Sequence, residues 1–170
     1  MKIEWFDLGK FLLRLFAGVL MFFAGIEKFL YTSWGGHTSG WTARGFLLGA
    51  ASGTSLNSWF AGMAGNATID SLVMWGEVLI GLALILGLLT RLAALFGIIE
   101  NGLFWIASYK AGAGPWGVGW ANGPLELNAA LVAMYIFFIL AGAGLTLGLD
   151  MYIHKMEPVK SKKWLQAIFG

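Results

Sequence analysis

Several ionisable residues stand inside or beside long apolar stretches, where a charge is costly and a chemical role is the first explanation to consider. Glu77 and Glu100 each lie within an apolar run, while Lys28 and Glu126 lie near the ends of two others. Ionisable side chains in membrane helices usually face the bundle interior or a water-filled cavity. Carboxyl groups placed there can relay protons, and cations can hold anions through charge-assisted hydrogen bonds. These residues are therefore the first candidates for a functional site.

Four apolar stretches are long enough to cross a bilayer as α-helices and would position these residues. The 170-residue chain is 58% hydrophobic and only 12% charged, and its mean hydropathy is +0.74. A soluble domain carries about 25% charged residues, and a spanning helix needs roughly 20 mostly apolar residues. The predicted spans are residues 8–30, 72–89, 92–109 and 125–149. The expected fold is all-α, an integral membrane four-helix bundle that forms a single membrane domain over residues 1–170.

The basic residues predict the orientation, because Lys and Arg in short loops tend to stay on the cytoplasmic side. Four spans would place both termini and the turn at residues 90–91 on one side. That side has eight basic residues and the other has three; the eight are Lys2, Lys10, Arg14, Arg91, Lys155, Lys160, Lys162 and Lys163, and the three are Lys28, Arg44 and Lys110. Both termini are therefore expected in the cytoplasm, beneath the plasma membrane. The basic tail, residues 150–170, is expected to contact anionic lipid headgroups rather than nucleic acid.

Two irregular segments would connect the spans on the outer side. Residues 31–70 form a long connection, and a long connection without structure of its own would be unusual. We therefore expect short helices within it, near residues 44–51 and 56–63. The second segment, residues 111–124, is rich in glycine and tryptophan. Its tryptophans, and most of the nine in the chain, could form an interfacial aromatic belt.

The chain lacks cysteine and has two histidines, His37 and His154. Without cysteine it can form no disulfide, thiolate metal site or iron–sulfur ligand set. The two histidines are far apart in sequence and lie on opposite sides in the predicted topology, so a haem or zinc site within one subunit is not expected. Neither a phosphate-binding loop nor a dinucleotide-binding glycine fingerprint is present. A redox function would use a dissociable cofactor or a partner, with no metal, haem or flavin held by this chain.

The predicted topology places several candidates in the outer half of the bundle, under the long loop. They are Lys28, Glu77, Lys110 and Glu126, with His37 and Arg44 above them. Two structural alternatives stay open, because Arg14 and Lys28 could snorkel from helix ends and Glu77 could pair with a neighbouring cation. Glu100 lies deepest in its span and has no cation within one helical turn. Gly18, Gly25 and Gly81 are expected to let helices approach closely beside this polar path.

Spaced glycines and charges recur in three of the predicted spans. The first span reads Arg14-Leu15-x-x-Gly18-x-x-Met21-x-x-x-Gly25-x-x-Lys28-Phe29, and the second reads Glu77-x-x-x-Gly81-x-x-Leu84-x-x-Gly87-x-x-Thr90-Arg91. The fourth reads Glu126-x-x-x-Ala130 and continues through Gly142-x-Gly144 to Asp150. This pattern resembles the DoxX/DoxD family of four-helix membrane proteins and covers nearly the whole chain. The loop run Gly40-Trp41-Thr42-Ala43-Arg44-Gly45-Phe46-Leu47, with Gly49-Ala50-Ala51, is more similar to the DoxD branch.

The DoxD resemblance implies the membrane subunit of a thiosulfate:quinone oxidoreductase, which joins two thiosulfates into tetrathionate and passes electrons to a quinone. It implies a dissociable quinone from the bilayer pool and a second small membrane subunit that is DoxA-like, while a homo-oligomer stays open. The implied substrate-binding residues are Lys28, Arg44, His37, Lys110 and Trp41, the catalytic residues Glu77 and Glu126, and the quinone-binding residues Glu100, Trp105 and Trp120. Two alternatives remain. One is a non-catalytic anchor or assembly factor for another oxidoreductase, and the other is a carrier of a small anion or lipid substrate.

Overall fold

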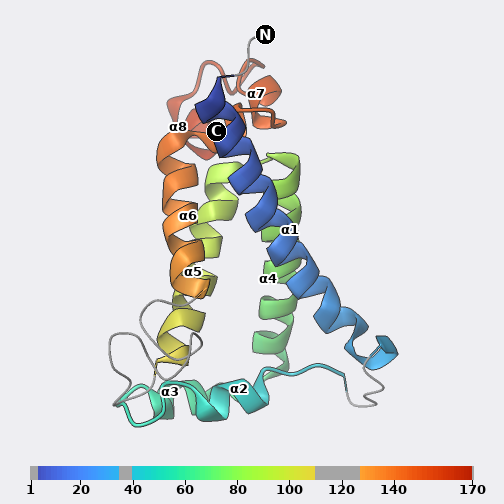
Figure 1. The fold of residues 1–170 in the computed structure, drawn as a ribbon, viewed down its shortest axis with the longest axis vertical. Helices are drawn as coiled ribbons and strands as arrows, with labels where there is room; N and C mark the ends of the chain where they lie inside the picture. The colour runs from blue at the N-terminus through green and yellow to red at the C-terminus, as the bar shows by residue number, and fades with distance from the viewer. Residues whose placement is uncertain (1–3, 35–39, 110–126, 170) are drawn as a thin grey trace.

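The computed structural model describes residues 4–34, 40–109 and 127–169, and these are arranged as a bundle of helices without strands (Figure 1). The long helices are α1 (Trp5–Trp34), α4 (Ala67–Leu86), α5 (Thr90–Ser108) and α6 (Leu127–Ala141). The short ones are α2 (Arg44–Gly49), α3 (Asn57–Gly62), the 3-10 turn η1 (Ala143–Leu145), α7 (Asp150–Ile153) and α8 (Lys163–Ile168). The predicted all-α helical bundle is confirmed.

Among the described residues, three helices are long and apolar enough to cross a membrane: α1 over Trp5–Leu30, α4 and α5. The described part of the fourth helix, α6, has 15 residues, so it is about 22 Å long against a hydrocarbon layer of about 30 Å. The prediction that this span continues to residue 149 is wrong. The helix ends at Ala141 because Gly142 adopts a left-handed conformation with φ 58°, a common way for a helix to stop.

The helix order in space follows from close backbone contact between α1 and α4. A Cβ atom added at Gly18 would lie 2.8 Å from the backbone nitrogen of Ile85, and one added at Gly25 would lie 2.6 Å from the Val78 side chain. A Cβ atom at Gly81 would meet the backbone of Phe22. The predicted packing role of these three glycines is therefore confirmed. On the other side, α4 packs against α5 and α5 against α6.

The long outer connection folds into α2 and α3, which lie across one end of the bundle (Figure 1). Asp70, in the first turn of α4, fastens the start of α2, because its carboxylate accepts hydrogen bonds from Thr42 Oγ1 and the Ala43 backbone nitrogen, both at 2.8 Å. At the other edge the Ala51 nitrogen donates to the Ala107 carbonyl at 2.6 Å. The two short helices predicted within this connection are confirmed, and the connection is fixed to both α4 and α5.

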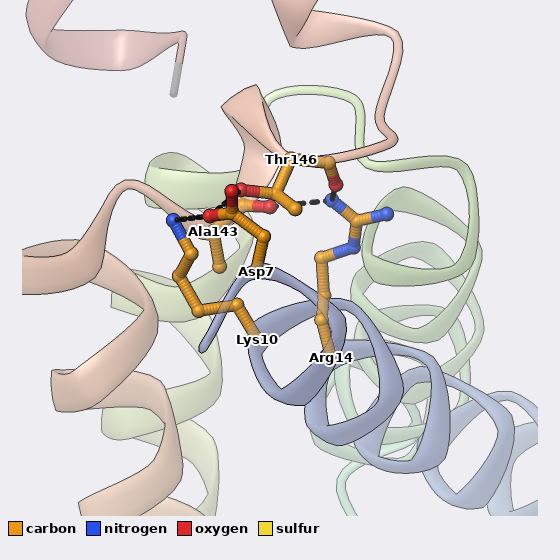
Figure 2. A network of polar contacts seen from close by, with 5 residues as sticks. All are labelled: Asp7, Lys10, Arg14, Ala143 and Thr146. Atoms are coloured by element: carbon orange, nitrogen blue, oxygen red, sulfur yellow. Dashed lines mark hydrogen bonds and ion pairs between the residues drawn. The ribbon is translucent and has the colours of Figure 1, made fainter. Parts of the chain in front are cut away.

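The opposite end of the bundle holds both ends of the chain (Figure 1) and a buried arginine. Arg14 is 0% exposed, so snorkelling is not its role. Its guanidinium donates to the carbonyls of Ala143, Thr146 and Leu147 at 2.6, 3.1 and 3.0 Å, and Figure 2 shows Ala143 beside the Arg14 side chain and Thr146 above it. The segment that follows α6 therefore does not continue the helix, and its carbonyl groups surround Arg14.

Asp150 completes this buried network from the other side. Its carboxylate accepts hydrogen bonds from the backbone nitrogens of Leu89 and Thr90 at 2.8 and 2.9 Å, which occupies donors at the first turn of α5. Asp150 also attracts Arg14 electrostatically. Its backbone nitrogen donates to the Gly87 carbonyl at 2.8 Å. The turn between α4 and α5 is thus held by the residues that come after α6.

The predicted orientation across the membrane can be tested by labelling introduced cysteines. Ser55 lies at the α2 and α3 end and Ser161 lies near the C-terminus, and both are exposed. Ser55→Cys should react with an impermeant thiol reagent from outside intact cells, and Ser161→Cys only after the cells are opened. The unmodified chain has no cysteine and so reports background labelling. Labelling in the reverse order would place both termini outside.

Candidate functional site

Two of the predicted charged site residues, Lys28 and Glu77, meet between α1 and α4. The Lys28 ammonium donates to Glu77 Oε2 at 2.5 Å and to the Ala24 carbonyl at 3.1 Å. Glu77 is 4% exposed, and the two residues are joined across 49 positions of sequence. The pairing of Glu77 with a neighbouring cation, one of the open alternatives, is what the structure contains. Lys28 is therefore neutralised within the chain, and an external anion would have to compete with Glu77 for it.

Trp41 covers this ion pair from the outer side. The Lys28 ammonium lies 5.2 Å from the centroid of the Trp41 ring, which is within the range of a cation–π interaction. Trp41 belongs to the connection that Asp70 fastens to α4 through Thr42 and Ala43. The Lys28 ammonium is thus surrounded by the Glu77 carboxylate, the Ala24 carbonyl and the Trp41 ring.

Glu100 brings a second carboxyl group to this cluster from α5. Both of its carboxyl oxygens are buried, and neither has a hydrogen-bond partner among the residues that the structure describes. A Cβ atom added at Gly76 would lie 3.0 Å from each of these oxygens, so the carboxyl group packs against α4 directly beside Glu77. Glu100 also interacts electrostatically with Glu77 and Lys28. The structure therefore places two acidic groups and one cation together in the bundle.

Two polar residues adjoining the cluster were missed by the sequence analysis. Tyr135 of α6 is 0% exposed, and its ring packs against α5 at Gly97; it also interacts electrostatically with Glu77 and Glu100. Asn101 is 2% exposed and donates to the Gly97 carbonyl at 3.2 Å. The sequence did contain a signal for both residues, because a tyrosine and an asparagine within apolar spans are polar groups that need partners. Neither residue carries a formal charge, so neither stood out among the acidic and basic residues.

A cavity of about 380 Å³ lies at the C-terminal end of α5, and it is lined by Ala51, Thr54, Ser55, Leu56, Trp105, Ile106 and Tyr109. Its walls are mainly apolar and aromatic, and hydroxyl groups come from Thr54, Ser55 and Tyr109. Leu56 is 44% and Ile106 is 45% exposed, so the cavity borders the outer surface of the helix. Pockets of this kind suit small, largely apolar ligands held by a few polar groups. Trp105, a predicted quinone-binding residue, is one of the lining residues, whereas Glu100 is not.

The remaining predicted site residues are either exposed on the surface or outside the described residues. Arg44 begins α2 and is exposed, so the structure places it on the surface while Lys28 is bound to Glu77 below. Four other predicted site residues, His37, Lys110, Trp120 and Glu126, lie outside the described residues. The described part of the site is thus a buried carboxyl and ammonium cluster, an aromatic cavity and an exposed arginine. Their roles in chemistry stay predictions.

Comparison with protein-family models gives a match to DoxX over residues 9–110. No curated protein and no solved structure matches the chain. The matched segment covers more than half of the 170 residues and contains Lys28, Glu77, Glu100 and Trp105. It also contains the three helices that are long and apolar enough to span a membrane, apart from the first turn of α1. This chain belongs to the DoxX family and is a helical membrane protein.

Proposed function

We propose that this chain is the membrane subunit of a thiosulfate:quinone oxidoreductase and that it binds the quinone. The observation that carries the proposal is the cavity beside Trp105. Its apolar and aromatic walls fit a flat neutral ring, and the hydroxyl groups of Ser55 and Tyr109 can donate to ring carbonyl oxygens, whereas Thr54 donates to the Ala51 carbonyl. The cavity also borders the membrane-facing side of α5. The donor, thiosulfate, comes from the DoxD resemblance of residues 40–51. That resemblance also implies a second small membrane subunit.

The proposed reaction needs both an electron donor and a proton source. Two thiosulfate ions form one sulfur–sulfur bond and release two electrons, and the quinone takes up these electrons and two protons to become a quinol. The carboxyl groups of Glu77 on α4 and Glu100 on α5 are buried, and α5 also contributes Trp105, Ile106 and Tyr109 to the cavity. A carboxyl group can transfer protons in such a step if it lies within hydrogen-bond reach of the acceptor directly or through water. We assign the proton transfer to Glu77, which is one of the two carboxyl groups, with Glu126, that the sequence predicts to be catalytic.

Removing the aromatic wall of the cavity should weaken quinone binding. Trp105→Ala is expected to raise the quinone KM roughly 10-fold, since loss of an aromatic contact of about 1.4 kcal/mol corresponds to a tenfold change. The assay is thiosulfate-dependent reduction of a soluble short-chain quinone in membranes, corrected for the amount of protein. Trp59→Ala is the matched control, because Trp59 belongs to α3, is 53% exposed and does not line the cavity. Equal quinone KM values in both variants would remove the quinone from this cavity.

Among the described cations at the α2 and α3 end of the bundle, Arg44 is the one that we assign to binding of the electron donor, thiosulfate. Arg44→Ala should raise the thiosulfate KM and leave the quinone KM unchanged. Arg44→Lys keeps the positive charge and should therefore raise the thiosulfate KM less than Arg44→Ala does. A hydrogen bond to a charged group contributes about 1.5 to 3 kcal/mol, and the lower end applies because Arg44 is exposed. The measurement is a thiosulfate titration at saturating quinone. Wild-type thiosulfate kinetics in Arg44→Ala would place the donor elsewhere.

A second function, that of a non-catalytic anchor for another oxidoreductase, is favoured by the Lys28–Glu77 ion pair. Lys28, one of the cations expected to hold thiosulfate, is already neutralised inside the chain. Purified protein in lipid, supplied with thiosulfate and a soluble quinone, separates the two functions. Turnover supports the oxidoreductase subunit. No turnover by this chain, together with loss of a membrane-bound activity when it is deleted from its host, supports the anchor.

A further inference from the structure

We propose that Glu77 and Glu100 share one exchangeable proton inside the bundle, with Lys28 as the positive charge of the site. The proposal uses the buried charges alone, and it does not depend on thiosulfate, on quinone or on a partner subunit. It assigns to this chain a proton-binding site formed by α1, α4 and α5.

The first step is a count of charge. Lys28 supplies one positive charge, while Glu77 and Glu100 supply two negative charges when both are ionised. Such a cluster would keep one net negative charge in the interior of a membrane bundle, where an uncompensated charge is strongly unfavourable. One bound proton removes that charge.

The groups that face the cluster from the other elements add no second cation in the described part of the chain. From α6 comes Tyr135, which is neutral as a phenol, and from α5 comes the amide of Asn101 beside Glu100. On α1, Glu27 interacts with Glu77 and adds a further negative charge from the exposed side. The neighbours therefore increase the need for a positive charge rather than supply one.

The packing around Glu100 favours a proton over a metal ion as the missing charge. Both carboxyl oxygens lie against Gly76, where even a Cβ atom would stand at 3.0 Å. Hard cations bind six or more oxygen ligands, and no group of three His, Cys, Asp or Glu side chains gathers anywhere in the described ranges. A proton needs only one oxygen atom and no additional space.

The hydrogen bonds indicate how the proton is divided between the two acids. Glu77 Oε2 accepts from the Lys28 ammonium at 2.5 Å, as an ionised carboxylate does. Neither oxygen of Glu100 accepts a hydrogen bond from the described residues, so the proton resides on Glu100 in this arrangement. If Lys28 moves toward Glu100, the proton can pass to Glu77. The cluster stays neutral in both arrangements.

Infrared spectroscopy of the purified protein in lipid tests this assignment directly. At neutral pH the wild-type spectrum should contain the carbonyl-stretch band of a protonated carboxyl group, which shifts in heavy water, and Glu100→Gln should lose that band. Glu77→Gln should also lose it, because Glu100 would then ionise and pair with Lys28. Glu27→Gln is the control, since Glu27 is exposed, and it should retain the band.

Two results would overturn the proposal. One is a Glu100→Gln difference spectrum that contains only carboxylate bands, or, if that variant does not fold, a wild-type spectrum without a deuterium-sensitive carboxyl band. The other is an increase in the denaturation temperature on adding sodium ions at constant pH and ionic strength, which would assign the site to a metal cation. Stability supplies a further check. The double variant Glu77→Gln with Glu100→Gln leaves Lys28 without a carboxylate and should denature at a lower temperature than either single variant.

Discussion

Replacing Arg14 with alanine is expected to cause the largest loss of stability of any single change considered for this protein. The variant would leave three backbone carbonyls without their donor and would deprive Asp150 of the charge that attracts it. Removing one partner from a buried charged network costs about 3 to 5 kcal/mol. Arg14→Lys should recover only part of this loss, because an ammonium cannot reproduce the planar fork of donors. The measurement is the denaturation midpoint of the protein in detergent or lipid.

Lys10 provides the matched control on the same helix. Its ammonium lies 2.8 Å from Asp7, whose side chain is 40% exposed, and Figure 2 shows this pair beside Arg14. Partly solvated ion pairs contribute about 0 to 1 kcal/mol, so Lys10→Ala should change the midpoint little. Equal midpoints for Arg14→Ala and Lys10→Ala would mean that the carbonyl cage around Arg14 contributes no more than a surface pair.

Replacing Glu77 with glutamine is expected to lower quinone reduction by on the order of 10²-fold, if Glu77 transfers a proton in the rate-limiting step. The variant should still fold, because the amide oxygen can accept the Lys28 hydrogen bond and Glu100 lies close enough to balance the charge of Lys28. The measurement is turnover at saturating thiosulfate and quinone, corrected for the amount of folded protein.

Glu27→Gln is the control for this experiment, because Glu27 precedes Lys28 on α1 but is exposed. Its turnover should equal that of the wild type. Full activity in Glu77→Gln would reduce Glu77 to a structural partner of Lys28, and the anchor function would then become the better account of the chain.

Part of the candidate site could be predicted from the types and depths of its residues. Glu77 and Glu100 were identified because carboxyl groups are rare in apolar spans, and Lys28 because it ends one. Trp105 was identified as a possible quinone contact, and it lines the cavity. Pairing of Glu77 with a cation was left open by the sequence, but which cation is its partner could not be predicted. The pairing joins residues 49 positions apart and depends on how α1 is rotated against α4.

The end of the fourth helix shows why the apolar pattern was insufficient there. Residues 142–149 are largely apolar or small, so composition extended the predicted span through them. The structure instead ends α6 at Ala141 and turns the following segment so that the carbonyls of Ala143, Thr146 and Leu147 face Arg14. A buried guanidinium requires acceptors, and backbone outside a regular helix can provide them.

The sequence by itself determined the helical membrane bundle, the short helices of the outer connection and the glycines that let α1 approach α4. These features depend on local properties, namely apolar length, helical spacing and residue size. Tertiary structure alone decided which charge meets which partner: Lys28 with Glu77, Arg14 with the carbonyls after α6, and Glu100 with the backbone at Gly76. In an interior that screens poorly, each buried charge is compensated by whatever group lies nearest in space. That neighbour is set by how the helices are packed and rotated, which spacing along the chain does not specify.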